Sequence, residues 1–474
     1  MLFPSVLFLS FFLPVTLAAY FLAPGIQIKN LVLLGLSLVF YAWGEPVFVL
    51  IMLGSIGFNY LAALLIDGQA GGRRRLALAG TLAVNLSVLG LFKYAGFLVR
   101  SLDLVTDPFG VRVTAPAIAL PLGISFFTFH CMSYAIDVYR GRFPANRQLR
   151  EIALYIALFP QLIAGPIVRY KTIARQLAFR RHSLGRASVG MRMFVIGLAQ
   201  KVLIADELAG LADAVFDHTR RPNLGEAWLG TAAYTLQIYF DFAGYSNMAI
   251  GLGLVFGFAL PRNFNQPYRS VSITEFWRRW HITLSTWFRD YLYIPLGGNR
   301  GSAAKTYRNL ITVFLLCGLW HGASWTFVLW GAYHGAFLVG ERAGLTKLFK
   351  GWAATLAWPY ALVAVMAGWV LFRAPDLPQA LQVWRGMAGL NGLGRLGPAL
   401  APVLGAGHLV LLPLAFALAV ISFRRRAGST SRFRLALPPA LIGTADMAIV
   451  LVLLALSVLS ISGRSYIPFL YFRF

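Results

Sequence analysis

Apolar runs of about 20 residues recur along this chain, and short segments with charged residues separate them. A helix of that length spans the hydrocarbon core of a bilayer, so the pattern predicts an all-α polytopic membrane protein. We expect roughly ten to twelve transmembrane helices, with re-entrant and interfacial helices around a central funnel. Ten spans follow from the pattern: 2–23, 30–44, 46–66, 76–98, 115–137, 188–212, 228–259, 353–373, 405–423 and 438–460.

The charged residues between these runs predict an orientation. Lys29 follows the first run and the arginines at 73–75 follow the third, which places the N-terminus outside and the 73–75 loop in the cytoplasm. The arginines at 424–426 return to the cytoplasm, so the last run delivers the tail to the outside. We therefore expect a multi-pass protein of the inner membrane with both termini in the periplasm. The first run is too long for a signal-peptide core, so we interpret it as a retained helix.

The stretch 151–168 is apolar but interrupted, because Pro160, Gly165 and Pro166 fall inside it. Basic residues flank it on both sides, so a single crossing would place one basic group outside. A re-entrant dip keeps both groups inside, and broken backbone at membrane depth is tolerated where it lines a cavity. This stretch therefore predicts a cavity that opens to the cytoplasm.

The run 307–340 is longer than one span requires, and basic residues again lie on both sides. If both flanks are cytoplasmic, the chain must enter the membrane here and return. Gly318 and Gly322 are the candidate break points, so we expect a bend near His321.

The segment 272–294 predicts one amphipathic helix. Ser272 and Glu275 match the S-x-x-E capping box of a helix start, and Pro295 ends the pattern. Apolar residues fall near one face and polar residues near the other: Trp277, Trp280, Leu284, Trp287 and Phe288 against Arg278, Arg279, Thr283, Ser285 and Arg289. Such a helix is suited to lie in the membrane interface or to dip into the bundle, and not to cross.

Composition and charge narrow the function classes. Hydrophobic residues make up 58% of the 474 positions and charged residues only 12%, about half the charged share of soluble proteins. No long polar linker divides the chain, so we expect one membrane domain, 1–474. The net charge of +25 fits positive-inside loops and anionic lipid better than nucleic acid, although outward-facing arginines could also meet an anionic polymer. Cys131 and Cys317 lack the spacing of disulfides or metal ligands, so no metal site is expected.

Polar side chains gather inside the predicted span 228–259: Gln237, Asp241, Tyr245, Ser246 and Asn247. An ionisable residue at that depth normally faces the bundle interior and marks a functional site. Asp241 could equally be hydrogen-bonded to a neighbouring helix for structural reasons, and the sequence alone leaves both interpretations open.

Histidine is the candidate for chemistry. His321, in the motif L-W-H-G-A-S-W, could take a proton from a hydroxyl and return one to a leaving thiol, as acyl transfer from a thioester requires. The alternative, which composition alone favours, is a neutral histidine hydrogen-bonded between helices. His281 could be a second base or an orienting partner for His321, or an interfacial residue with no catalytic role. Nucleophile-elbow, Walker, dinucleotide-binding and zinc-protease motifs are absent from the sequence.

Five longer motifs carry a resemblance to a known family. They are PLGISFFTFH at 121–130, FPQLIAGPIVRY at 159–170, QIYFDFAGYSNMAIG at 237–251, FWRRWHITLSTWFRDYLYIPLGGNR at 276–300 and LWHGASWTFVLWG at 319–331. With them the sequence resembles the membrane-bound O-acyltransferase (MBOAT) family over nearly its whole length, and within it the bacterial envelope branch typified by the alginate O-acetyltransferase membrane subunit. The resemblance implies a single MBOAT-type membrane domain with acetyltransferase activity.

The family pattern also implies roles for individual residues. His321, in the W-H-G motif, matches the catalytic histidine, and His281, in the R-R-W-H motif, lines the same reaction funnel. Related envelope systems have a short C-terminal aromatic motif whose tyrosine accepts the acyl group and relays it outward, and Tyr471 in FLYFRF matches that position. An interfacial aromatic anchor is the alternative for Tyr471. The candidate substrate-binding residues are Asp241, Asn247, Trp320, Arg278 and Arg279.

The resemblance implies a reaction and partners as well. Acetyl-CoA or another acyl thioester would dock on the cytoplasmic side as donor, and no cofactor would stay bound. The acetyl group would cross the membrane for O-acetylation of an extracytoplasmic, alginate-like polysaccharide, with a periplasmic SGNH-type acetyltransferase as partner. Peptidoglycan O-acetylation and teichoic-acid D-alanylation are alternative reactions that the same membrane domain would carry out. From the residues alone, a proton-coupled transporter with His321 and Asp241 as a proton relay also stays open.

Overall fold

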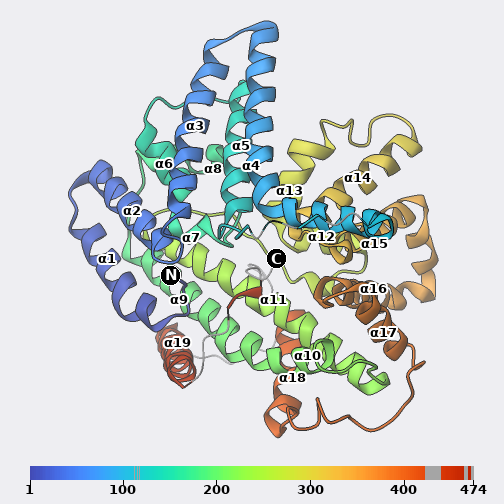
Figure 1. Ribbon diagram of the computed structural model, residues 1–474. Coiled ribbons are helices and arrows are strands. Elements are labelled where there is room, and N and C mark those ends of the chain that lie inside the picture. The colour runs from blue at the N-terminus through green and yellow to red at the C-terminus, as the bar shows by residue number, and fades with distance from the viewer. Residues whose placement is uncertain (111–112, 115, 117, 422–438, 464–467, 471–474) are drawn as a thin grey trace.

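Helices form all the regular structure of the part of the chain that the computed structural model describes, residues 1–110, 113–114, 116, 118–421, 439–463 and 468–470 (Figure 1). The predicted all-α class is therefore confirmed. The arginines at 424–426 and Tyr471 lie outside the described residues. Among those residues six helices are long and apolar enough to cross a membrane: Gly25–Ala42, Phe48–Gly68, Gly71–Phe109, Leu184–Phe216, Ala353–Arg373 and Ala445–Ser462. This supports a multi-pass membrane body, whereas the number of ten to twelve spans stays a prediction.

The N-terminal helices form the outer part of the molecule. They are η1 (Phe8–Phe12), α1 (Leu13–Leu22), α2 (Gly25–Ala42), α3 (Phe48–Gly68) and α4 (Gly71–Thr106), which the short η2 (Asp107–Phe109) follows. The helices α3 and α4 project from the body in blue at the top of Figure 1. Only 11% of the apolar window of α4 is buried, so most of its side chains are placed to face lipid.

A long helix lies at the centre of the molecule. The helix α11 (Leu224–Val255) has 32 residues, and 25 of them are buried. It packs against the continuous run of α9 (Leu184–Ala199), η3 (Gln200–Ala205) and α10 (Asp206–Phe216). Two glycine pairs bring the backbones of α9 and α11 together, because a Cβ atom on Gly251 or Gly197 would overlap the carbonyl oxygen of Gly190 or Gly244, respectively.

Four shorter helices follow α4 and η2. They are α5 (Ile124–Tyr139), α6 (Leu149–Ala157), α7 (Phe159–Leu162) and α8 (Tyr170–Ala178). Of these, α7 packs against α11, whereas α5 and α6 pack against α3. The predicted interruption of 151–168 is confirmed, since α6 ends at Ala157 and irregular backbone joins α7 to α8. Residues 152–168 are all buried, which agrees with broken backbone enclosed by protein. Whether the stretch is re-entrant relative to a bilayer stays a prediction.

The single amphipathic helix predicted for 272–294 is wrong. The helix starts after Ser272 as predicted, and Ser272 Oγ accepts a hydrogen bond from the Glu275 N–H at 3.0 Å. Only this half of the predicted capping box forms, because Glu275 Oε2 accepts from the Val271 N–H at 3.0 Å where a capping box would use the Ser272 N–H. The chain then forms three pieces: α12 (Ile273–Arg279), α13 (Ile282–Phe288) and η5 (Arg289–Tyr293). Residues of the preceding segment cause the break: the Asn265 N–H donates to the Arg279 carbonyl, and the Ile282 N–H donates to the Asn263 carbonyl, each at 2.9 Å.

The predicted bend near His321 is confirmed. The helix α14 (Ala303–His321) ends at that residue, and α15 (Trp325–Ala343) runs back against it. Gly322 is the break, whereas Gly318 stays inside α14, where it lets the helix approach the Phe327 carbonyl. The remaining elements are η4 (Pro267–Arg269), η6 (Leu345–Phe349), η7 (Gly351–Leu356), α16 (Ala357–Arg373), α17 (Leu377–Met387), α18 (Ala406–Val420) and α19 (Pro439–Ser462).

Candidate functional site

His321 is the last residue of α14, at a helix end inside the molecule. The chain leaves the helix because Gly322 adopts an extended conformation with φ −158°. A Cβ atom at that position would overlap the Phe327 ring, so the turn requires glycine. The last carbonyls of a helix have no partner within the helix, and buried carbonyls need donors from elsewhere.

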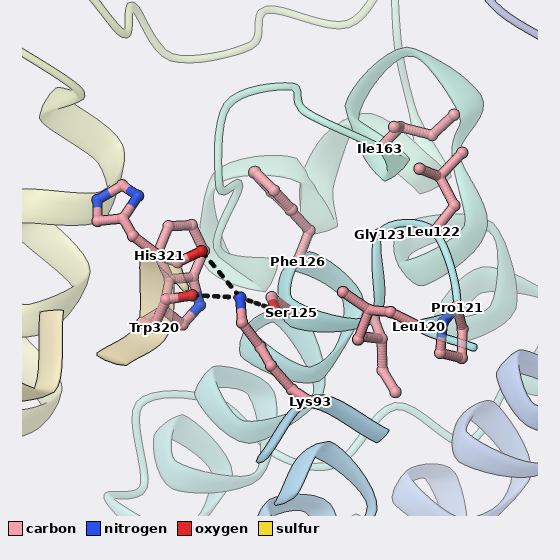
Figure 2. A pocket seen from close by; sticks show the side chains of 11 residues that line it. Lys93, Leu120, Pro121, Leu122, Gly123, Ser125, Phe126, Ile163, Trp320 and His321 are labelled. Atoms are coloured by element: carbon pink, nitrogen blue, oxygen red, sulfur yellow. Dashed lines mark hydrogen bonds between the residues drawn. The ribbon is translucent and has the colours of Figure 1, made fainter. Parts of the chain in front are cut away.

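The lipid-facing helix α4 supplies those donors. The Tyr94 hydroxyl donates to the Leu319 carbonyl at 2.9 Å. The Lys93 ammonium donates to the Trp320 carbonyl at 2.5 Å and to the His321 carbonyl at 3.2 Å, as Figure 2 shows. Two adjacent residues of α4 therefore satisfy three consecutive carbonyls at the end of α14. A cation at a helix C-terminus also interacts favourably with the helix dipole.

The imidazole of His321 lies among aromatic rings. The ring centroids of Trp320, Trp330 and Phe372 are 4.9, 5.0 and 5.2 Å away, each in an edge-to-face arrangement. The residue is 3% exposed. Figure 2 shows the imidazole pointing away from Lys93, while the backbone carbonyl faces it. His321 thus presents its carbonyl to one side and its imidazole to the other.

A small open pocket borders this helix end. Its volume is about 90 Å³, well below the ~300–1,000 Å³ of drug-sized ligand pockets, so it suits a small group. Gly123 in its wall has φ +74°, and a Cβ atom there would lie 2.8 Å from the Leu162 carbonyl oxygen, so the wall packs directly on α7. The lining residues are Lys93, 120–126, Ile163, Trp320 and His321 (Figure 2).

His281 occupies the break between α12 and α13. It is fully buried and has φ +41°, a left-handed conformation that is uncommon outside glycine and often occurs at functional sites. Its Nδ1 lies 3.0 Å from Oδ1 of Asn263. An amide oxygen only accepts hydrogen bonds, so Nδ1 is the donor, and in the neutral ring Nε2 carries the lone pair. The Trp320 ring lies 6.1 Å from the His281 ring, which places the same indole beside both histidines.

Asn263 also connects the turn at His281 to the interrupted stretch 151–168. Its Oδ1 accepts a hydrogen bond from Thr283 Oγ1 at 3.0 Å, and Thr283 Oγ1 in turn accepts from the Ile167 N–H at 2.9 Å. The left-handed turn at His281 is therefore held by residues of two other segments.

An ion pair outside the candidate membrane spans joins the segment before α8 to η5. Arg169, just before α8, donates to Asp290 Oδ2 at 2.6 Å, and Arg289 donates to Asp290 Oδ1 at 2.6 Å. Burial raises the pKa of Asp290, but the hydrogen bonds from Arg289 and Arg169 hold it below its ordinary value. The carboxylate therefore stays ionised at neutral pH and fixes η5 to the start of α8.

The two predicted arginines do not line the pocket in the described part of the chain. Arg278 is exposed. Arg279 forms an ion pair with Glu275 at 2.7 Å and donates to the Asn265 carbonyl at 3.1 Å, so it stabilises the end of α12. Trp320, in contrast, lines the pocket and contacts both histidines.

The polar residues predicted on the central helix also lie apart from the pocket. Asp241 forms an ion pair with Lys201 at 2.6 Å. The Asn247 amide donates to Gln200 Oε1 at 2.8 Å and so joins α11 to η3. Tyr471 lies outside the described residues, but Leu470 before it is buried against Asp241.

Sequence reasoning missed Lys93, Tyr94, Asn263 and Lys201. A signal existed for the two lysines, because each is an ionisable residue inside an apolar run. Nothing in the local pattern marks Asn263 or Tyr94, whose partners are distant in sequence. No group of three or more His, Cys, Asp or Glu side chains among the described residues is arranged to hold a metal ion.

Comparison with known proteins places the chain among membrane acyltransferases. The family described as MBOAT, membrane-bound O-acyltransferase family, matches residues 125–374. The chain is 45% identical to a probable alginate O-acetylase of Azotobacter vinelandii over the full length of both proteins. It is 40% identical to a peptidoglycan O-acetyltransferase of Helicobacter pylori, with 83% of this chain and 81% of the relative covered. A teichoic acid D-alanyltransferase of Bacillus subtilis is 28% identical over 50% of this chain and 61% of its own.

Proposed function

We propose a specific reaction for this chain, which belongs to the membrane-bound O-acyltransferase family and is therefore an acyltransferase. The enzyme moves an acetyl group from a cytoplasmic acyl thioester, such as acetyl-CoA, to the outer side of the inner membrane. There the acetyl group serves the O-acetylation of an extracytoplasmic polysaccharide of the alginate kind. The full-length similarity to a probable alginate O-acetylase supports this substrate class.

One observation carries the assignment of chemistry. His321 and His281 lie beside the same indole, that of Trp320, and Trp320 and His321 border an open pocket. In the proposed reaction His321 accepts the proton of an acceptor hydroxyl as its oxygen attacks the thioester carbonyl carbon. The tetrahedral intermediate then collapses, the C–S bond breaks, and the thiolate takes the proton from the imidazolium. His281, held by Asn263 through Nδ1, lines the same site.

The pocket suits the acceptor side of this reaction. In the predicted orientation the C-terminal half of α4 and the chain before α5 face the periplasm, and both contribute pocket residues. The acceptor therefore approaches from outside, and it meets the imidazole on the side of His321 that faces away from Lys93 (Figure 2). The donor approaches from the cytoplasmic side, along the buried broken segments that end near Arg169 and Asp290.

The proposed acceptor is the hydroxyl of Tyr471, which relays the acetyl group to a periplasmic SGNH-type acetyltransferase. The burial of Leu470 in the core supports a tail that reaches the interior of the molecule. Peptidoglycan O-acetylation is the second candidate function, because a peptidoglycan O-acetyltransferase is 40% identical over most of both chains.

Replacing His321 tests the catalytic role. His321→Ala removes the proposed base, so acetylation of the exported polysaccharide should fall by about 10²- to 10⁴-fold, as measured by ester-released acetate. The matched control is His218→Ala, since His218 is an exposed histidine. Both variants should reach the membrane in wild-type amounts. Wild-type acetylation in His321→Ala would show that the catalytic assignment is wrong.

A deletion strain separates the two polymers. Loss of acetyl esters from the exported polysaccharide, with peptidoglycan unchanged, is the expected result in mass analysis of both fractions. Loss from peptidoglycan alone would instead assign the second candidate function.

A further inference from the structure

A buried group of charged side chains lies on η3, α10 and α11, outside the pocket. The Lys201 ammonium is 2.6 Å from Asp206 Oδ1 and 2.6 Å from Asp241 Oδ1. The Lys201 and Asp241 side chains are each 2% exposed. Burying such charges is costly unless every one of them has partners. Two carboxylates share one ammonium here, so the group needs a further donor.

That donor comes from the C-terminal segment of the chain. The Leu470 N–H donates to Asp241 Oδ2 at 2.9 Å. The Lys201 ammonium lies over the Phe469 ring, 4.7 Å from its centroid, as in a cation–π contact. Phe469 and Leu470 are 1% and 4% exposed. Both members of the Lys201–Asp241 ion pair therefore contact this segment, which Figure 1 draws in dark red against α11.

Further contacts fix the position of the segment. The Phe469 ring packs edge-to-face on Tyr245, one helical turn along α11 from Asp241, with centroids 4.7 Å apart. The residue after Asp241 is Phe242, whose ring lies 4.6 Å from the His281 ring. Asp241, on which the segment docks, is thus the neighbour in sequence of Phe242, whose ring contacts His281 of the candidate site.

We propose that Lys201, Asp206 and Asp241 form a receptor for the chain's own C-terminal segment, and that docking there positions residue 471 for acyl transfer. The receptor recognises a backbone N–H through a carboxylate and an aromatic ring through an ammonium. The docking depends only on the contacts above, whereas the role of residue 471 rests on the proposed function. A hydroxyl held one residue from a fixed backbone atom reacts as if at high local concentration.

Cysteine cross-linking tests the docking without any assay of activity. A chain with Tyr245→Cys and Phe469→Cys, in a background with Cys131→Ala and Cys317→Ala, should be cross-linked by a short bis-maleimide that spans the space left by the two rings, and the linked peptide is detected by mass spectrometry. Adding Leu470→Pro removes the N–H that donates the hydrogen bond to Asp241, so the rate of linkage should fall about tenfold. Adding Leu470→Ala keeps that N–H and should retain most of the linkage. Equal linkage in these two variants, or no linkage in the parent, would overturn the receptor.

Changes in the receptor give a second, independent test. Asp241→Asn should lower the rate of linkage about tenfold because the charge pairing with Lys201 is lost. The matched control is Asp446→Asn, an exposed carboxylate on α19 whose ion pair with Arg192 spans 3.9 Å. The control should leave linkage unchanged. A decrease of the same size in both variants would contradict the proposal.

Kinetics of the full-length enzyme test the positioning role. Leu470→Pro, with native Tyr245 and Phe469, should lower kcat for acetylation about tenfold and leave KM for the thioester unchanged, because the donor approaches from the other side. An unchanged kcat together with a confirmed cross-link would keep the docking and remove the role of residue 471. His321→Ala reports on the proposed function separately, since it does not touch the receptor.

Discussion

The helix pairs α9–α11 and α14–α15 both pack through facing glycines, but only in the second pair does a helix end inside the molecule. In the α9–α11 pair, Gly190 faces Gly251 and both helices continue past the contact. In the α14–α15 pair, Gly318 and Gly331 bring the backbones together, and α14 then stops at His321. A continuous helix satisfies its own carbonyls, whereas an interrupted one depends on donors from elsewhere. The comparison indicates that close glycine packing in α9–α11 stabilises the fold, while α14–α15 also creates a place for chemistry.

The largest effect is expected where two continuous helices touch. A Cβ atom on Gly251 would overlap the Gly190 carbonyl oxygen, which belongs to backbone and cannot rotate away. Gly251→Ala should therefore lower the free energy of unfolding by about 3 kcal/mol. Thermal unfolding in detergent measures this loss. In Gly57→Ala the new Cβ atom meets nothing within 4 Å, so this control on α3 should be neutral or slightly stabilising. Equal melting temperatures for the two variants would contradict the comparison.

A change at the interrupted pair should affect activity more than stability. In Gly322→Ala the new Cβ atom meets the Phe327 ring, a side chain that can move at the cost of shifting the turn after His321. We expect acetylation activity to fall about 100-fold while the melting temperature falls less than in Gly251→Ala. Gly340→Ala, whose Cβ atom would lie 3.7 Å from the Leu345 side chain, is the control on the same hairpin. The idea fails if Gly322→Ala retains full activity.

The smallest effect concerns one hydrogen bond to the helix end. Tyr94→Phe removes the donor to the Leu319 carbonyl but keeps the ring in place. The cost should be about 0.5–1.5 kcal/mol of unfolding free energy. Lys93→Met removes the donor to two carbonyls and should cost more, about 1.5–3 kcal/mol, because the bonds involve a charged group. A larger loss for Tyr94→Phe than for Lys93→Met would show that the ammonium is not the main partner of this helix end.

The outer helices could be predicted from hydropathy because contact with lipid demands apolar side chains over a fixed length. The break at His321 was also predictable, since excess length and two glycines both indicated it. The break at His281 was not, because it depends on backbone bonds from residues 263–265 to Arg279 and Ile282, which no local pattern records. Asn247 shows the same limit: its polarity was visible, but its partner Gln200 lies 47 positions away.

The family motifs drew attention to Trp320, and the structure places it in the pocket wall beside both histidines. The same motifs drew attention to Arg279, which instead pairs with Glu275. A motif marks residues that occur together, and it does not separate those that face a cavity from those that hold a helix.

The position of Lys93 on α4 has a consequence for how the enzyme depends on its surroundings. Among α2, α3 and α4, the helix α4 has the smallest buried share. It is also the helix that donates hydrogen bonds to the C-terminal end of α14. We expect a tilt of α4 that matches the thickness of the bilayer to move Lys93, which donates to the backbone carbonyl of His321. The activity of the enzyme is therefore expected to depend on the acyl-chain length of the surrounding lipids.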